Sequence, residues 1–326
     1  MRPPRFWFAS PGVVSTLLIP FSWLWRLGTV LRRWRTRPQR APVPVVCIGN
    51  LTVGGAGKTP MAAAWLMRLQ DSGHAVHLVS RGYGGSLMGP HRVDPARDSA
   101  AEVGDEPLLL AQSAPVWVAR DRAAGARAAA AAGASLVLLD DGFQNPGLIK
   151  DAAVVMVDAS QGFGNRQVVP AGPLREPVAQ GLARADLVVL AGEPPAQQLA
   201  CSRWPELAGA LPARLAPVET GLDLNGQPVV AFAGIARPEK FYETLGAMGA
   251  RLLAFHSFPD HHVYAPQVLE RMRREAAVQG AMLVTTEKDA VKLPASFRRE
   301  VMALPVRMMP TDWGPFDQII TAICTK

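Results

Sequence analysis

Between residues 43 and 190 the chain repeats one pattern: a short continuous apolar run, a turn, and then a stretch with helical periodicity. Continuous apolar runs are typical of strands that are buried on both faces of a parallel sheet. Helices are expected at 59–70 and at the alanine-rich 122–132. The alternation predicts an open, doubly wound, mostly parallel α/β sheet. The expected strands are residues 44–48, 75–80, 115–119, 136–139, 153–157 and 187–190.

A proline-dense segment follows, and it is the best candidate for a domain boundary or hinge. Its prolines are Pro194, Pro195, Pro205, Pro212 and Pro217. Beyond it we expect a second, smaller α/β unit, with strands at 229–233, 252–255 and 282–286 and a helix at 265–279. The predicted division of the chain is an arm at 1–40, a first domain at 41–220 and a smaller domain at 221–326 that closes over the cleft.

The first 40 residues form a basic, aromatic arm with eight arginines, no acidic residue and four of the eight tryptophans. Their apolar stretch, 13–31, is interrupted by Pro20, Arg26 and Gly28. A bilayer span needs roughly 20 apolar residues. Leucines and tryptophans flanked by arginines are typical of a helix in the headgroup region of an anionic membrane. We therefore expect a membrane-surface helix, with packing on the protein's own core and a true span as the alternatives.

The arm also accounts for the positive net charge of the whole chain. The formal net charge is +7, and without the eight arginines of the arm the rest of the chain is at −1. A nearly neutral body disfavours a nucleic-acid partner, because tracking phosphates requires basic groups on the folded domain. The widely spaced Cys47, Cys201 and Cys324 exclude a disulfide framework and favour a reducing, cytosolic setting. No obligate protein partner is evident.

The strongest chemical signal is GNLTVGGAGKTP at 49–60, between an expected strand and an expected helix. This is the context of a phosphate-binding loop, whose glycines let backbone amides surround phosphate oxygens. Lys58 is expected to reach the terminal phosphates, and the Thr59 hydroxyl to ligate Mg²⁺. Thr52 replaces the first glycine of the usual G-x-x-x-x-G-K-[ST] pattern. The expected nucleotide-binding residues are Thr52, Val53, Gly54, Gly55, Ala56, Gly57, Lys58 and Thr59.

Asp140 and Asp141 follow directly on the apolar strand expected at 136–139. Downstream of a phosphate loop, a carboxylate at the end of a strand holds or orients the Mg²⁺ of a bound nucleotide. Without the loop, the pair could simply cap the next turn. Together with the loop it predicts a metal role for both residues, and the sequence does not decide which carboxylate is nearer the metal.

Two further polar clusters, VGDEP at 103–107 and DHHVY at 260–264, lie far apart in the chain. Phosphoryl transfer to a hydroxyl benefits from a carboxylate that accepts the proton of the acceptor, and a histidine can orient that carboxylate. Each cluster alone also has an ordinary explanation as a helix cap or a polar surface. Neither has the ligand spacing of a zinc site.

These motifs together resemble one family, the tetraacyldisaccharide 4'-kinases of lipid A biosynthesis, over nearly the whole chain. Asn145 departs from the family pattern, in which a histidine is expected after DDGFQ. The blocks that carry the resemblance are GNLTVGGAGKTP (49–60), SRGYG (80–84), VGDEP (103–107), DDGFQ (140–144), PAGPLRE (170–176), AFAGIA (231–236), DHH (260–262) and TTEKD (285–289).

The resemblance implies a P-loop NTPase-like kinase that transfers the γ-phosphate of ATP to the 4'-hydroxyl of a tetraacylated glucosamine disaccharide 1-phosphate. It implies Asp105 as the base, paired with His261 across the domain cleft. Lys58 and Thr59 would serve ATP and Mg²⁺, with Asp140 and Asp141 as the acids at the strand end. The lipid substrate implies a peripheral or monotopic protein at the cytoplasmic face of the inner membrane.

The acceptor side is less well defined by the motifs. Gln144 is carried over from the family as a polar site residue. Arg81, Tyr83 and Arg120 are expected on the acceptor side, because a lipid phosphate needs basic partners.

Two other classes of protein share part of this pattern. A P-loop GTPase usually carries an Asn-Lys-x-Asp block, and the nearest string here, TEKD at 286–289, has the wrong spacing. A membrane-recruited ATPase of the partitioning type would have a similar basic arm. The expected pairing of Asp105 with His261 and the second domain count against it, whereas nucleotide turnover without an acceptor would favour it.

Overall fold

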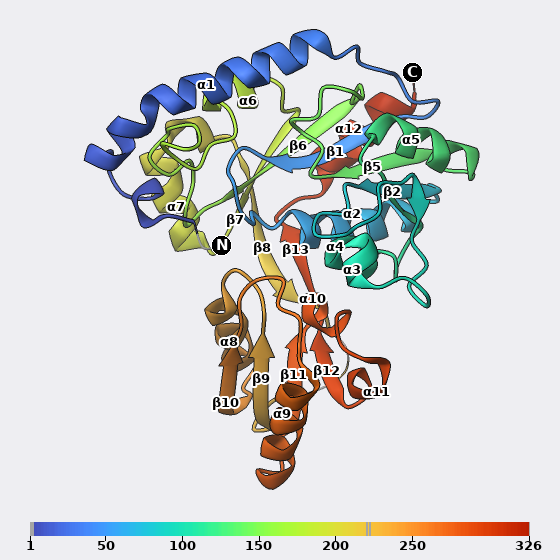
Figure 1. Cartoon of the computed structure of the whole chain (residues 1–326), viewed down its shortest axis with the longest axis vertical. Coiled ribbons are helices and arrows are strands. Elements are labelled where there is room, and N and C mark those ends of the chain that lie inside the picture. Colours follow the sequence, from blue (N-terminus) through green and yellow to red (C-terminus); the bar gives the residue numbers. More distant parts are fainter. Residues whose placement is uncertain (1–2, 220, 222, 326) are drawn as a thin grey trace.

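The computed structural model describes residues 3–219, 221 and 223–325. Within these residues, nine strands form one large sheet and four strands form a second, smaller sheet. Figure 1 shows the large sheet with its helices in the upper part of the molecule and the small sheet below it. The chain leaves the large sheet after Pro217, enters the small sheet at Pro228 and returns to the large sheet at Val306.

The large sheet has the strand order β13-β8-β7-β6-β1-β5-β2-β4-β3. Its two edge strands are antiparallel to their neighbours, and the strands between them are parallel. The predicted doubly wound, mostly parallel sheet is therefore confirmed. The strands are β1 (Val45–Asn50), β2 (Val76–Ser80), β3 (His91–Arg92), β4 (Val116–Val118), β5 (Leu136–Asp140), β6 (Ala152–Asp158), β7 (Leu187–Ala191), β8 (Leu211–Pro217) and β13 (Val306–Pro310).

Helices cover both faces of the large sheet, which is why its strands are apolar without alternation. In β1, for example, Val46 and Ile48 belong to the core on one face, and Val45 and Cys47 belong to the core on the other. The first face carries α2 (Lys58–Asp71), α4 (Asp105–Leu110) and α12 (Gly314–Cys324), and α3 (Ala100–Val103) precedes α4. The second face carries α5 (Arg122–Ala131), α6 (Val178–Leu182), α7 (Pro194–Arg203) and the short 3₁₀ helix η2 (Pro205–Leu207).

The small sheet is parallel throughout, in the order β10-β9-β11-β12. Phe241 and Leu245 of α8 pack on one face, and Leu269 and Met272 of α9 pack on the other. The sequence-predicted strands and helix of this unit are all present. The elements are β9 (Pro228–Ala233), α8 (Pro238–Ala247), β10 (Arg251–Ser257), α9 (Pro266–Val278), β11 (Met282–Thr286), α10 (Glu287–Ala290), α11 (Ala295–Arg298) and β12 (Val301–Leu304).

The structure differs from the sequence prediction at the C-terminal end, where 221–326 was expected to form one unit. Instead, β13 pairs with β8 in the large sheet, and Phe316 of α12 packs edge-on against Trp65 with ring centroids 4.9 Å apart. The apolar side chains of α12 thus complete the core over α2. Residue 326 lies outside the described residues.

The proline-dense segment, expected as a domain boundary or hinge, belongs to elements of the first domain, and the chain leaves the large sheet directly after its last proline, Pro217. Pro194 begins α7, Pro205 begins η2, and Pro212 and Pro217 lie on β8. Proline is tolerated in the first turn of a helix and near sheet edges, so these prolines mark element starts and a strand beside the sheet edge.

The arm begins with the 3₁₀ helix η1 (Arg5–Trp7), followed by α1 (Val13–Arg35), which runs unbroken through Pro20 and Gly28. Figure 1 shows α1 along the upper edge of the molecule. Ser15 Oγ donates to Ala171 O (2.9 Å) and Ser22 Oγ donates to Val168 O (2.7 Å), so one narrow stripe of the helix faces the body. By length and composition alone, α1 is long and apolar enough to cross a membrane.

Candidate active site

The phosphate loop joins β1 to α2 (Figure 1). Gly54 and Gly57 have φ values of 124° and 79°, which side chains disfavour. Gly57 is the N-cap of α2, and no side chain caps that helix end. The first amides of α2 are therefore available to an anion, which the helix dipole also favours. Ala56 is buried, Gly55 is exposed and Thr59 is half-buried.

Asn50, at the end of β1, positions the lysine of the loop. Lys58 Nζ donates to Asn50 Oδ1 (3.2 Å), and Asn50 Nδ2 donates to Gly54 O (3.0 Å). Asn50 is fully buried, so its amide needs these partners. The motif analysis gave Asn50 no role, although a polar residue at the end of an apolar strand was a signal for one.

The first residues of the loop are held by the segment at 170–176. Thr52 forms an isolated bridge with Leu174, and Val53 N donates to Pro173 O (2.7 Å). These backbone contacts hold Thr52 and Val53, at the start of the loop, against the segment at 170–176. Thr52 is the position at which the usual pattern has glycine.

Asp140 and Asp141 stand beside this loop because β5 pairs with β1, with Asp140 aligned to Ile48. Asp141 has two cationic partners: Arg175 Nη1 lies 2.9 Å from its Oδ1, and Lys58 Nζ lies 3.8 Å from the same oxygen. Burial favours the neutral acid, but these two cations outweigh it and lower the pKa of Asp141.

Asp140 has no such partners. Its side chain is buried, and among the described residues Oδ1 finds no hydrogen-bond donor. Burial, followed by the charges of Glu106 and Asp141, raises the pKa of Asp140 to about 7. A buried carboxylate oxygen without a partner is costly to ionise, and a bound cation would remove that cost.

The donor set at this point suits Mg²⁺ that arrives with a nucleotide. In the part of the chain that the structure describes, no group of three or more His, Cys, Asp or Glu side chains is arranged to hold a metal. Mg²⁺ in phosphoryl-transfer sites is usually held by one or two carboxylates together with waters and substrate phosphates. Asp140, with its orphaned oxygen, fits that arrangement better than Asp141, whose oxygens are engaged by cations.

Asp105 and His261, separated by 156 residues in sequence, meet in the structure. His261 Nδ1 lies 2.9 Å from Asp105 Oδ2 and 3.0 Å from Oδ1. Asp105 is the first residue of α4 on the large sheet, and His261 lies in the loop between β10 and α9 of the small sheet. The pair therefore joins the two sheets at one point.

The two members of this pair shift each other's pKa in opposite directions. The hydrogen bond to Asp105 raises the pKa of His261 against the effect of its own burial. Burial would raise the pKa of Asp105, but the hydrogen bond with His261 and the charge of Lys288 outweigh it and lower that pKa. At neutral pH the carboxylate is thus ionised and can accept a proton.

Close backbone contact explains the glycines near Asp105. Gly104, with φ of 90°, sits so close to Tyr83 O that a Cβ would lie 2.7 Å from that oxygen. This contact presses the SRGYG segment at 80–84 against the start of α4. The Tyr83 ring consequently lies beside the His261 ring, with centroids 5.8 Å apart.

The remaining sequence-predicted residues lie at the carboxyl ends of the strands. Arg81 follows β2 and Arg120 follows β4 by two residues, and both are exposed. Gln144 is engaged inside the protein: its Nε2 donates to Asn50 O (2.9 Å) and to Glu176 Oε1 (3.1 Å). Their roles toward a substrate stay predictions.

Sequence reasoning missed Arg175 and Glu176 as individual side chains. Arg175 binds Asp141 with both terminal nitrogens and donates to Gln144 Oε1 (3.3 Å). The buried Glu176 pairs with Arg33 of α1 (2.9 Å) and with Arg184 (2.5 Å). The only signal for these contacts was the PLRE string, which does not show which partner each charge meets.

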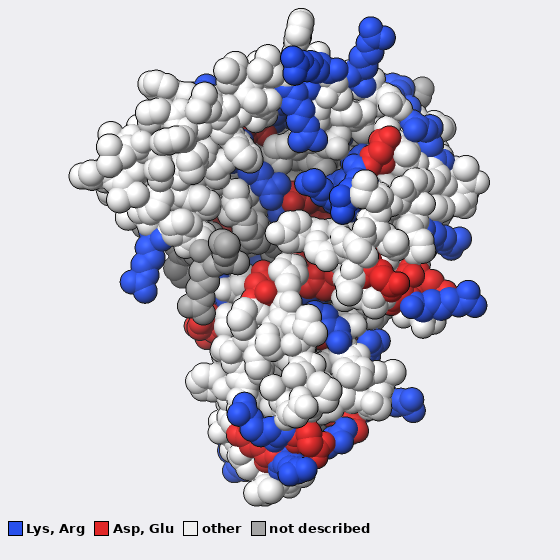
Figure 2. Space-filling model, viewed as in Figure 1, with Lys and Arg blue, Asp and Glu red and all other residues white. Residues whose placement is uncertain are grey.

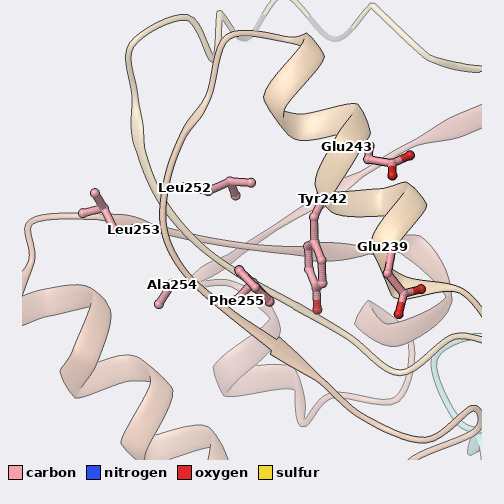
Figure 3. A pocket seen from close by; sticks show the side chains of 7 residues that line it. All are labelled: Glu239, Tyr242, Glu243, Leu252, Leu253, Ala254 and Phe255. Atoms are coloured by element: carbon pink, nitrogen blue, oxygen red, sulfur yellow. The ribbon is translucent and has the colours of Figure 1, made fainter.

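A hollow of about 550 Å³ lies elsewhere, between α8 and the edge strand β10. Figure 3 shows Glu239, Tyr242 and Glu243 on the helix side and the side chains of residues 252–255 on the strand side. Its lining includes no residue of the predicted site, and a lining without basic groups is unsuited to phosphate.

Comparison with known proteins decides the family of this chain. The sequence profile of the family described as tetraacyldisaccharide-1-P 4'-kinase matches residues 14–325. The chain belongs to this family. It is 52% identical to the tetraacyldisaccharide 4'-kinase of Rhodospirillum centenum (strain ATCC 51521 / SW) over 99% of this chain and 97% of the relative. It is 51% identical to that of Jannaschia sp. (strain CCS1), with 99% of both chains covered.

A solved structure of a family member is also similar. It is the "apo" form of LpxK from Aquifex aeolicus in complex with ATP, with a TM-score of 0.73 and 26% identity. The match covers 95% of this chain and 99% of that chain. The similarity thus extends over both sheets of this chain.

The environment of Asp140 predicts a stability difference that does not depend on activity. Its folded-state pKa of about 7 lies above the ordinary value of 3.8. The contribution of Asp140 to the stability of the wild type therefore falls as the pH rises from about 4 to about 7. Asp140→Asn removes this loss, so at pH 8 without Mg²⁺ or nucleotide its melting temperature should exceed that of the wild type, and the two should converge near pH 4.

Asp141→Asn is the matched control. It leaves Arg175 and Lys58 without their carboxylate and should lower the melting temperature at pH 8. Mg²⁺ with a nucleotide should narrow the gap between Asp140→Asn and wild type. Equal melting temperatures of Asp140→Asn and wild type at pH 8 would contradict the conclusion that the Asp140 carboxylate is buried without a compensating partner.

Proposed function

We propose that this protein is an ATP-dependent lipid-sugar kinase. It transfers the γ-phosphate of ATP to the 4'-hydroxyl of a tetraacylated glucosamine disaccharide 1-phosphate, a step of lipid A biosynthesis. The proposal rests on membership of the tetraacyldisaccharide 4'-kinase family and on one observation above all. An ionised carboxylate on the large sheet, Asp105, is hydrogen-bonded to a histidine on the small sheet.

In this reaction the acceptor oxygen attacks the γ-phosphorus, the bond between that phosphorus and the β–γ bridging oxygen breaks, and ADP leaves. The hydroxyl proton passes to the Asp105 carboxylate, whose lowered pKa keeps it ionised beforehand. His261 orients that carboxylate through Nδ1 and stabilises its charge. Positioning and charge stabilisation dominate catalysis in phosphoryl transfer, so the geometry of this pair matters more than its basicity alone.

On the nucleotide side, the loop amides of residues 52–59 bind the phosphates and Lys58 reaches the terminal ones. The contacts of Lys58 Nζ with Asn50 and Asp141 hold its ammonium group at the loop. The residues that fit Mg²⁺ are Thr59 and Asp140, with Asp141 fixed beside them. When bound, Mg²⁺ neutralises charge on the β- and γ-phosphate oxygens.

On the acceptor side, Arg81 and Arg120 provide basic groups for the phosphate of the lipid, and Tyr83 packs on the ring of His261. Gln144 acts indirectly, because its amide ties the phosphate loop to Glu176.

The arm holds the site at the surface of an anionic membrane, at the cytoplasmic face of the inner membrane. Apart from the buried stripe with Ser15 and Ser22, α1 exposes a row of large apolar side chains: Val13, Val14, Leu17, Phe21, Trp23, Leu24, Trp25, Leu27, Val30, Leu31 and Trp34. Figure 2 shows a largely uncharged surface at the upper left, along α1, and basic side chains projecting near its other end. This arrangement supports a monotopic membrane helix better than a helix packed on the protein's own core. Arg2 of the arm lies outside the described residues.

The direct test is label transfer from γ-labelled ATP to a tetraacylated disaccharide 1-phosphate in detergent micelles. The labelled lipid should carry its new phosphate at the 4' position. ATP hydrolysis at the same rate with and without the lipid, and no labelled lipid, would favour the partitioning-type ATPase instead.

Lys58→Ala should lower kcat by about 10²–10³, which corresponds to about 3–4 kcal/mol of lost charge stabilisation. The reason is that the ammonium group balances charge that develops on the transferred phosphoryl group. The control is Lys240→Ala, at an exposed lysine on α8, and its kcat should equal that of the wild type. A near-normal kcat for Lys58→Ala would show that ATP does not bind at this loop.

Asp105→Asn should lower kcat by about 10²–10⁴ and leave the affinity for ATP nearly unchanged, because it removes a proton acceptor and no nucleotide contact. His261→Ala should lower kcat as well. If the two act as a unit, the double variant should be hardly slower than the worse single variant. Multiplicative losses in the double variant would argue that the residues act independently.

Leu17→Gln/Leu24→Gln should weaken binding to anionic vesicles, measured by sedimentation, by about 10²–10⁴-fold, because each leucine that enters the membrane contributes about 1.5–3 kcal/mol. Both leucines are about two-thirds exposed, so the fold should be unaffected. Leu199→Gln on α7, with 69% exposure, is the matched control. Unchanged vesicle binding in the double variant would rule out α1 as the docking element.

A further inference from the structure

The TTEKD string at 285–289 has no part in the reaction as described so far. It forms the end of β11 and most of α10. Asp289 is fully buried: its carboxylate accepts from Gly234 N (2.9 Å), Tyr264 Oη (2.9 Å) and Thr286 Oγ1 (2.7 Å). Because Tyr264 ends the DHHVY cluster, Asp289 anchors the loop that carries His261.

Lys288, the neighbour of this anchor, faces the other way, toward the large sheet. Its Nζ lies 3.1 Å from Asp260 Oδ1, 3.8 Å from Asp105 Oδ2 and 3.8 Å from Glu106 Oε1. Its side chain is 19% exposed. One ammonium group thus contacts three carboxylates, two from α4 and one from the loop beside His261. A lysine has three donors that can be directed separately, which suits such a position.

The charges explain why a cation is needed here. The same place must accept the triphosphate of ATP and a phosphorylated lipid, while Asp105, Glu106 and Asp260 all contribute negative charge. Figure 2 shows acidic side chains gathered at the level where the two sheets meet. Without a cation among them, the three carboxylates would repel one another and the incoming phosphates. The repulsion between the carboxylates of α4 and Asp260 would also favour separation of the two sheets.

We propose that Lys288 is the positioning residue of the catalytic pair: it binds Asp105 and Glu106 of the large sheet together with Asp260 of the small sheet, and so holds Asp105 in place against His261. The inference rests on the proposed kinase function. Lys288 acts through Asp105 and does not contact the acceptor.

Four charged or titratable side chains surround Asp105 in the described residues. His261 and Lys288 contact it directly, Lys292 adds a more distant positive charge, and Glu106 is its neighbour in α4. Lys292 is itself bound to the anchor Asp289 (2.7 Å), so it belongs to the support of the loop. Among the cations, Lys288 is therefore the one that can be altered without removing the pair or its anchor.

The test compares Lys288→Met, which removes the charge and keeps the length, with Lys288→Arg, which keeps the charge. Lys240→Met on the surface of α8 is the control. For Lys288→Met we expect kcat to fall about 10–10²-fold, KM for ATP to change less than about threefold, and the acid limb of the kcat–pH profile to move to higher pH. Lys288→Arg should keep the wild-type acid limb and most of kcat.

A second measurement makes the outcome independent of activity. If Lys288 holds Asp105 against His261, its loss weakens the hydrogen bond that raises the pKa of the His261 ring. That pKa, read by NMR titration of the full chain with His261→Asn to assign the signal, should therefore be lower in Lys288→Met than in wild type. Loss of the charge alone, with Asp105 still in place, would raise it. A purely structural lysine would lower the melting temperature without moving this pKa.

Three results would overturn the proposal: an unmoved or raised His261 pKa in Lys288→Met, a kcat equal to that of Lys240→Met, or a tenfold rise in KM for ATP at unchanged kcat. The last would make Lys288 a phosphate ligand. If wild-type protein itself fails to phosphorylate the lipid, the kinase function fails, and the His261 titration still reports whether Lys288 controls the pair.

Discussion

The hydrogen bond between Asp105 and His261 is the interaction on which the proposed chemistry depends, because it exists only while two separate sheets are held together. Asp105 starts α4 beside the large sheet, and His261 lies in a loop of the small sheet. Other contacts support the same closure: Arg237 before α8 binds Asp158 at the end of β6 and Ser160 Oγ (2.7 Å) just after it. In addition, β13 leads the chain directly back from β12 into the large sheet. The proposed general base therefore depends on the whole fold.

Charge balance is the second constraint, and it is solved differently on the two sides of the site. On the nucleotide side, Asp141 is neutralised by Lys58 and Arg175, while Asp140 is left with an oxygen that a divalent cation would satisfy. On the acceptor side, the carboxylates gather around Lys288. In the proposed mechanism, each side thus holds the negative groups that catalysis needs and pairs them with cations, which reduces their repulsion of anionic substrates.

The sequence predicted the parts of the fold that depend on local patterns. Continuous apolar runs identified the central strands, because strands buried on both faces need apolar side chains at every position. The prediction missed the edge strands β3 and β13 of the large sheet, the proline-containing β8 beside β13, and the edge strand β12 of the small sheet, since pairing at or near an edge leaves no such signal. The C-terminal return of β13 and α12 was missed because it depends on a distant core, where Phe316 meets Trp65. Likewise, motifs and resemblance supplied Asp105 and His261, but the roles of Asn50, Glu176 and Lys288 emerge only from their three-dimensional partners.

The most direct test of this account is an NMR titration of the His261 ring in wild-type protein and in Asp105→Asn, both as full chains. The titration needs no substrate and reports on the contact between the two sheets in solution. The account predicts a pKa above the ordinary value of 6.5 in wild type, because Asp105 stabilises the charged ring. In Asp105→Asn that pKa should fall. The same pKa in both proteins would show that the two side chains do not meet in solution, and would contradict a general base assembled from two sheets.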